Sequence, residues 1–146
     1  MNKKLATLVT LAALTLGAFA WECDCTVSTV KGCYAFKLNG LLLGSNGGPL
    51  EGVAEFNFDG KGNLEATQET VVNAVELDSF GHPQITGTYT VNKNCTGDMK
   101  LVFSDNRPPL DVHFVIGDNG KVIYGQTVET GILQMQFVGR AVNTND

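Results

Sequence analysis

Apolar and polar residues alternate along most of the chain, and the alternation is clearest between residues 52 and 62. Ala54, Phe56 and Phe58 fall on one side of an extended segment there, and mostly polar residues fall on the other. Strict alternation of this kind predicts a β-strand with one buried face. The following segment, residues 59–63, predicts a tight turn, because glycine tolerates positive φ and Asp and Asn side chains can bond their own backbone.

The same unit, a short alternating strand followed by a turn, repeats to the end of the chain. No segment keeps a sustained helical period. The predicted strands cover residues 31–43, 50–59, 64–73, 84–92, 99–103, 110–116, 122–128 and 132–141. In the strand at 122–128 we expect the inner face to carry Val122, Tyr124, Gln126 and Val128.

About eight strands at this spacing predict an all-β fold, either a barrel or a sandwich. Most connections are hairpin-sized, which favours a meander. An eight-stranded antiparallel meander closes naturally into an up-and-down β-barrel and so removes the exposed edges of an open sheet. A Greek-key sandwich is the competing architecture. A barrel of this size is either filled by side chains or holds one small ligand.

Residues 1–20 have the pattern of a secretory signal peptide. Lys3 and Lys4 are followed by an apolar run over residues 5–19, with a small-x-small cleavage site that ends at Ala20. The predicted mature chain is a single β-barrel domain, residues 21–146, that is secreted or periplasmic. No membrane anchor is predicted, because the apolar run is too short for a comfortable span and large residues precede the first cysteine.

Removal of the signal peptide makes the chain more acidic. Loss of Lys3 and Lys4 leaves eight basic residues against fifteen acidic ones, a net charge of −7. An acidic surface disfavours nucleic acid and anionic membranes as partners, since both are polyanions. The remaining 126 residues suit one domain with one core. The oligomeric state is left open.

Four cysteines, Cys23, Cys25, Cys33 and Cys95, lie in the predicted mature chain. Export favours disulfides, and a bond between Cys23 and Cys25 would close a very small, strained ring. Two alternatives remain: Cys23–Cys33 with Cys25–Cys95, or Cys25–Cys33 with Cys23–Cys95. A metal site is less favoured, because neither histidine shows metal-ligand spacing to the first two cysteines. No metal and no cofactor are predicted.

Several short motifs resemble those of a group of exported bacterial proteins. Residues 25–36 contain a cysteine, a short spacer and Lys-Gly-x-Tyr-x-Phe. Further matches are Phe-Asp-Gly-Lys-Gly-Asn at 58–63, Gly-Thr-Tyr-Thr-Val-Asn at 87–92 and Asn-Cys-Thr-Gly at 94–97. The matches span most of the predicted mature chain. This group is similar to the calycin and allene-oxide-cyclase barrels, which are eight-stranded up-and-down β-barrels.

The resemblance implies a disulfide pairing and an activity. In the group, the cysteine before the first strand pairs with the one in the Asn-Cys-Thr-Gly turn, which implies Cys25–Cys95 here and leaves Cys23–Cys33 as a second bond. The similarity to allene oxide cyclases suggests a cofactor-free isomerase or cyclase. The matched motifs are turns and core positions, so no catalytic residue is carried over from them.

Three residues are candidates for catalysis. Inside a barrel, Glu55 would be a carboxylate able to act as a base, but the aromatic side of its strand is the natural inner face, which places Glu55 in solvent. His113 could be a general base, and the competing interpretation is a surface histidine that pairs with Asp111 on the same face. Tyr89 is the third, because Gly87 beside it leaves room for a ligand.

Aromatic side chains on the inner faces form the predicted lining of the barrel. They would contact an apolar ligand, with tyrosine hydroxyls either orienting it or reaching the barrel rim. The candidate ligand-binding residues are Tyr34, Phe36, Phe56, Phe58, Tyr89, Phe103, Phe114 and Tyr124.

The sequence therefore favours a secreted barrel that binds a small apolar ligand. A cofactor-free isomerase or cyclase of the allene-oxide-cyclase type is the first alternative, since such an enzyme works mainly by shaping its substrate. A filled barrel that acts as a surface or interaction protein is the second. The room inside the barrel separates them, because an interior without space for a ligand would exclude both functions that need one.

Overall fold

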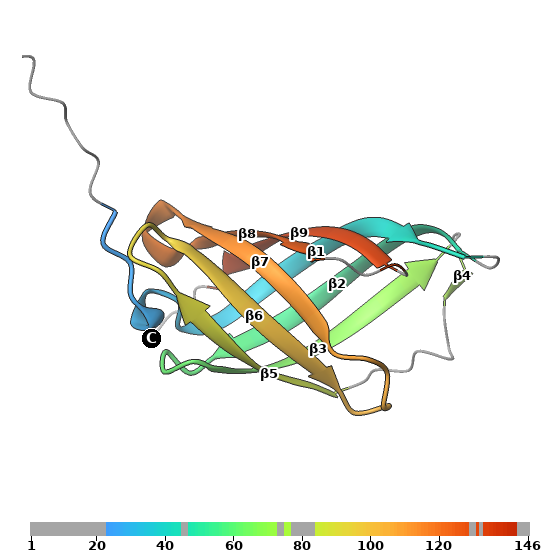
Figure 1. The fold of residues 1–146 in the computed structure, drawn as a ribbon, viewed down its shortest axis with the longest axis horizontal. Coiled ribbons are helices and arrows are strands. Elements are labelled where there is room, and N and C mark those ends of the chain that lie inside the picture. Colours follow the sequence, from blue (N-terminus) through green and yellow to red (C-terminus); the bar gives the residue numbers. More distant parts are fainter. Residues whose placement is uncertain are drawn as a thin grey trace, which may run out of the picture.

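The computed structural model describes residues 23–44, 47–72, 75–76, 84–128, 131 and 133–142. The predicted signal peptide and the loop that contains His82 lie outside these ranges. Figure 1 shows the strands wound around a common axis as a barrel. The strands are β1 Gly32–Leu42, β2 Gly48–Phe58, β3 Asn63–Val72, β4 Val75–Glu76, β5 Gln84–Val91, β6 Thr96–Phe103, β7 Leu110–Gly117, β8 Val122–Thr127 and β9 Leu133–Ala141, with the short 3₁₀ helices η1 Val27–Thr29 and η3 Asp118–Gly120.

The strands form a closed antiparallel meander. Each long strand pairs with the next long strand along the chain, and β1 pairs with β9 to complete the ring. The two-residue β4 pairs only with the end of β3, so β5 follows β3 in the barrel. The prediction of an eight-stranded up-and-down barrel is confirmed, and the Greek-key alternative is wrong. Each of the eight barrel strands has a partner on both sides.

Alternate side chains of each strand fill the inside of the barrel. Tyr34 and Phe36 of β1 are buried, as are Phe56 and Phe58 of β2. The ring centroids of Phe36 and Phe56 lie 4.6 Å apart, and those of Phe58 and Tyr89 lie 5.1 Å apart in an edge-to-face arrangement. Tilted and edge-to-face contacts at such separations are favourable. The core is therefore a connected cluster of aromatic rings.

Two glycines on the inner face make room for these rings. A Cβ atom on Gly139 of β9 would lie 2.3 Å from the ring of Phe36, and one on Gly125 of β8 would lie 2.2 Å from the ring of Phe137. No real Cβ contact is that short, so each ring occupies the volume that a larger residue on the neighbouring strand would need. Phenylalanine and glycine together give the close packing expected of a protein interior.

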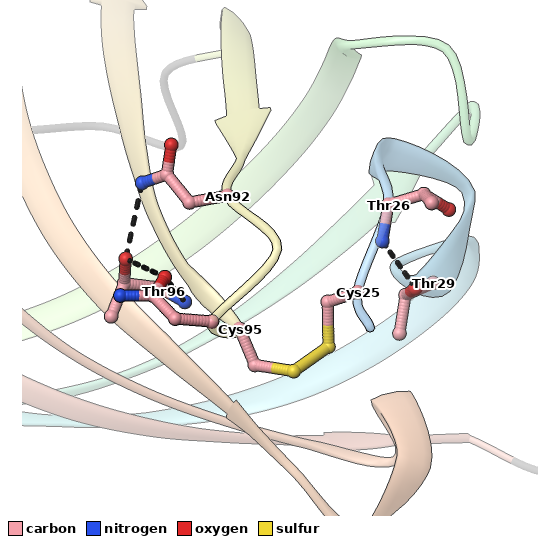
Figure 2. The surroundings of a disulfide bond; sticks show 7 residues. Cys25, Thr26, Thr29, Asn92, Cys95 and Thr96 are labelled. Atoms are coloured by element: carbon pink, nitrogen blue, oxygen red, sulfur yellow. Dashed lines mark hydrogen bonds between the residues drawn. A yellow bond between two sulfur atoms is a disulfide. The ribbon is translucent and has the colours of Figure 1, made fainter. Parts of the chain in front are cut away.

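The N-terminal arm closes one end of the barrel. Figure 1 shows η1 and η3 at this same end, and Val30, directly after η1, is completely buried. Figure 2 shows the disulfide that joins Cys25 in the arm to Cys95 in the turn between β5 and β6. The Cys25 N–H also donates to the Lys93 carbonyl at 3.2 Å. The arm is thus fixed to the barrel by the pairing that the resemblance implied.

The second predicted disulfide, Cys23–Cys33, is wrong, because both of these cysteines are free thiols. Cys33 precedes the buried Tyr34 on β1, so it lies on the outer side of that strand. Cys25 directs the arm to the turn between β5 and β6 instead of to β1. Cys23 belongs to the arm, two residues before the bonded Cys25, whereas Cys33 belongs to β1.

Strand β8 presents a different inner face from the predicted one. Val122 and Ile123 are both buried, whereas Tyr124 is 51% exposed. Gly125 lies on the inner side, where it accommodates the ring of Phe137. The expected inward orientation of Tyr124 is therefore wrong, and this side chain lies on the outside of the barrel.

Candidate functional site

The two buried tyrosines hold the closed end of the barrel together. The Tyr89 hydroxyl donates to the Val30 carbonyl at 2.8 Å, and the Val27 carbonyl lies 3.2 Å away. The Tyr34 hydroxyl donates to the Gly120 carbonyl. Burial raises the pKa of both phenols. These hydroxyls are engaged with the backbone of the arm and of η3, so they are not available to orient a ligand.

The predicted ligand-contacting phenylalanines all belong to the core. Phe103 lies at the end of β6 away from the disulfide, where the Arg107 guanidinium stands 4.8 Å from its ring centroid, a cation–π distance. Phe114 packs where a Cβ atom on Gly97 would lie 2.3 Å from its ring. The buried phenylalanines of the predicted set are Phe36, Phe56, Phe58, Phe103 and Phe114.

Glu55 lies on the outside of the barrel. It is exposed between the buried Ala54 and Phe56, as the alternation along β2 requires. With residues of β3 and β5 it lines a shallow surface hollow of about 250 Å³. Over the ranges that the structure describes, no acidic, basic or amide side chain is buried. Glu55 is therefore not placed to act on a ligand inside the barrel.

His113 also lies outside, and it pairs with a residue that the sequence did not single out. Its Nδ1 is hydrogen-bonded to Oδ1 of Asp98, which stands directly opposite on β6. The expected partner Asp111 faces Lys100 instead, with 3.8 Å between Asp111 Oδ1 and Lys100 Nζ. Directly opposed residues on neighbouring strands lie closer than residues two apart on one strand. The pairing of His113 with Asp98 could be predicted only from the register between β6 and β7, which the sequence of one strand does not give.

A hollow of about 610 Å³ opens beside the Asp98–His113 pair, over β6, β7 and β8. We call it the outer hollow. Its lining combines hydroxyl, amide, carboxylate and imidazole groups with two exposed apolar side chains. The side chains that give it this character are Asn92, Thr96, Asp98, His113, Val115, Tyr124 and Gln126. A second hollow of about 320 Å³ over β5, β6 and β7 shares Asp98 and His113 with it.

Tyr124 gives the outer hollow an exposed aromatic ring. It stands directly opposite Val115 on β7, which is 50% exposed, and Val138 on β9, which is 39% exposed. Alternation along residues 122–128 predicts Tyr124 inside the barrel, so this surface is not visible in the sequence pattern. Three consecutive apolar residues at 122–124 fit either face, and only the packing of the inner Gly125 decides between them.

The described ranges contain neither a metal-ligand cluster nor a membrane-spanning helix. Within them, no group of three or more His, Cys, Asp or Glu side chains is placed to hold a metal ion. Among the same residues, no helix is long and apolar enough to cross a membrane.

Comparison with known proteins identifies an architecture. No protein-family model matches the chain, and no curated protein matches it. The chain is similar to a solved structure described as a redesigned β-barrel, with a TM-score of 0.54 and 9% sequence identity over 81% of this chain and 96% of the other. The shared feature is the barrel. At this identity the likeness concerns the fold alone.

Proposed function

We propose that this protein is an exported binding protein that works through the outside of a filled barrel. The proposal is supported by the occupation of the barrel interior by side chains. Aromatic rings pack there against each other and against glycines, and both buried tyrosine hydroxyls donate hydrogen bonds to backbone carbonyls. Eight strands enclose an interior just wide enough for such side chains. The outer hollow offers the accessible polar and aromatic groups that a ligand needs.

Export is supported by the signal-like pattern of residues 1–20 and by the disulfide between Cys25 and Cys95. Disulfides persist mainly in oxidising compartments outside the cytosol. We therefore place the binding activity in the periplasm or the medium.

The two other functions suggested by the sequence need space that the core residues occupy. A small apolar ligand inside the barrel would have to displace packed rings such as Phe56 and Phe58, which are 6% and 1% exposed. A cyclase of the allene-oxide-cyclase type would also need a polar group directed at that ligand, and its candidate base Glu55 is exposed. We therefore favour the outer surface over the interior.

Uptake of a neutral apolar dye, N-phenyl-1-naphthylamine, tests this proposal. We expect no saturable rise in fluorescence when the dye is added to the folded protein. Phe56→Ala probed with benzene is the control for access to the core, because removal of a buried ring leaves a cavity that an apolar molecule of that size can enter. Saturable uptake by the unmodified protein, with one dye per chain, that persists in Tyr124→Ala would contradict the proposal and favour a ligand inside the barrel, since Tyr124 belongs to the outer hollow.

A further inference from the structure

A row of exposed, mainly apolar side chains crosses the outside of the barrel at right angles to the strands. Val115 on β7, Tyr124 on β8 and Val138 on β9 stand opposite one another in register. The row continues through Lys37 on β1 to Val53 on β2, which is 57% exposed. The Cβ atoms of residues directly opposite on neighbouring strands lie about 5 Å apart, so these residues form one continuous strip, which we call the apolar row.

A second row of polar side chains runs beside it, two residues further along the same strands. His113 on β7, Gln126 on β8, Gln136 on β9 and Asn39 on β1 are in register, and all of them are exposed. Asp98 on β6 adds the carboxylate that binds His113. The three amides have no side-chain hydrogen-bond partner within the described ranges. Each can therefore donate and accept hydrogen bonds to a ligand. We call this the polar row.

We propose that the two rows together bind a neutral oligosaccharide, an inference that rests on the proposed function of the outer surface. A pyranose ring has apolar C–H faces and a rim of hydroxyl groups. The ring of Tyr124 suits such a face, because aromatic rings pack well against C–H groups and bury a large area. The amides of Gln126 and Gln136 suit the hydroxyl rim, since each offers both donors and an acceptor.

The spacing of the rows suits a chain of sugars. Neighbouring strands lie about 4.8 Å apart, which is comparable with the length of one pyranose unit in a linear chain. Successive sugars can therefore lie over successive strands, from the outer hollow on β6–β8 across β9 towards β1. Each sugar would then have a side chain of the apolar row on one side and one of the polar row on the other.

Other occupants fit these rows less well. An extended peptide cannot be added as a further strand, because every barrel strand already has two partners. A second copy of the chain would need roughly 800 Å² of buried surface on each side, and the apolar row is a single residue wide. Anionic polymers are disfavoured by the net charge of −7 that the predicted mature chain carries. A neutral polymer meets no such repulsion.

Isothermal titration calorimetry with neutral hexasaccharides (cellohexaose, laminarihexaose and maltohexaose) tests the inference. We expect at least one of them to bind with a stoichiometry of about one per chain. Tyr124→Ala should weaken binding by about tenfold or more, because it removes the aromatic contact. Tyr124→Phe should keep most of the affinity, since it keeps the ring. Val102→Ala, an exposed position of β6 outside both rows, is the matched control and should bind like the unmodified protein.

Failure of the inference is distinguishable from failure of the proposed function. If none of the hexasaccharides binds, or if Tyr124→Ala binds as tightly as the unmodified protein, the inference is wrong. The inference is also wrong if sedimentation reveals a dimer that Tyr124→Ala abolishes. It is wrong as well if a peptide, and not a sugar, protects the Tyr124 ring from chemical modification. In each of these cases, exclusion of the apolar dye from the barrel still supports the proposed function, whereas uptake of the dye overturns that function itself.

Discussion

At the scale of single residues, Asp59 organises the turn between β2 and β3. Its Oδ1 accepts hydrogen bonds from the Lys61 and Asn63 N–H groups at 2.7 and 2.9 Å, and its Oδ2 accepts one from Asn63 Nδ2 at 2.7 Å. The sequence suggested this turn through the ability of Asp to bond its own backbone. These hydrogen bonds, with the Asn63 side chain first, lower the pKa of Asp59 to about 2.

Substitution of Asn63 tests this account of the Asp59 carboxylate. Asn63→Ala removes the largest cause of the shift, so the pKa of Asp59 should rise from about 2 towards its ordinary value of 3.8. Because the folded-state pKa is the lower one, ionised Asp59 favours folding above pH 4, and this contribution disappears as the pH falls to about 2. Two-dimensional NMR of the carboxyl carbons, titrated with acid, measures the pKa. Asn39→Ala, an exposed asparagine on β1, should leave it unchanged.

At the scale of secondary-structure elements, β8 and β9 depend on a glycine that faces a ring. Gly125→Ala would bring a Cβ atom against Phe137 on the neighbouring strand, where the undisturbed separation is only 2.2 Å. We expect a loss of about 1–3 kcal/mol in the free energy of unfolding, because overpacking forces a buried ring to move. Urea denaturation monitored by far-ultraviolet circular dichroism measures this loss.

A second substitution provides the control for this overpacking. Phe137→Leu in the Gly125→Ala background should recover part of the lost stability, since it removes ring atoms next to the new methyl group. Gly131→Ala should change stability little, because a Cβ atom there meets nothing within 4 Å. Equal losses from Gly125→Ala and Gly131→Ala would mean that glycine flexibility, and not the space beside Phe137, decides the effect.

The same elements indicate how far sequence patterns reach. Alternation predicted the strands and the inner faces of β1, β2 and β7, because each has a clear apolar side. It failed at β8, where residues 122–124 are all apolar and the inner position is held by Gly125. A glycine carries no hydrophobic signal, so its role becomes visible only beside its neighbour Phe137. Sequence periodicity describes single strands, whereas the inward face of β8 depends on packing between β8 and β9.

At the scale of the whole molecule, the candidate site follows from closure of the barrel. The Asp98–His113 pair and the apolar row join residues of different strands through register. Register is set by hairpin lengths and by which face is buried, so it cannot be deduced from the sequence of one strand alone. The sequence therefore predicted the barrel but not the surface on which we place its function. Tyr124 and His113 were both singled out as candidates, yet for roles other than the ones proposed here.

The disulfide ties the arm to the rest of the molecule, and its removal is the last prediction. Cys25 and Cys95 are 70 residues apart, and in the chain-entropy view a loop of that length contributes about 4 kcal/mol, within a usual range of about 2–5 kcal/mol. The double variant Cys25→Ala, Cys95→Ala should lose stability in that range in urea. Cys33→Ser should lose little, because Cys33 is a free thiol outside the core.

Alkylation of the denatured, unreduced protein provides an independent measure of the same bond. Mass spectrometry should detect two modified cysteines, Cys23 and Cys33, since only Cys25 and Cys95 are bonded. No modified cysteine would mean that a second disulfide forms and would restore the Cys23–Cys33 pairing. If the double variant keeps full stability, the arm is held by the hydrogen bonds of Tyr89 and of the Cys25 N–H alone. The closed end would then depend on these hydrogen bonds rather than on the covalent link.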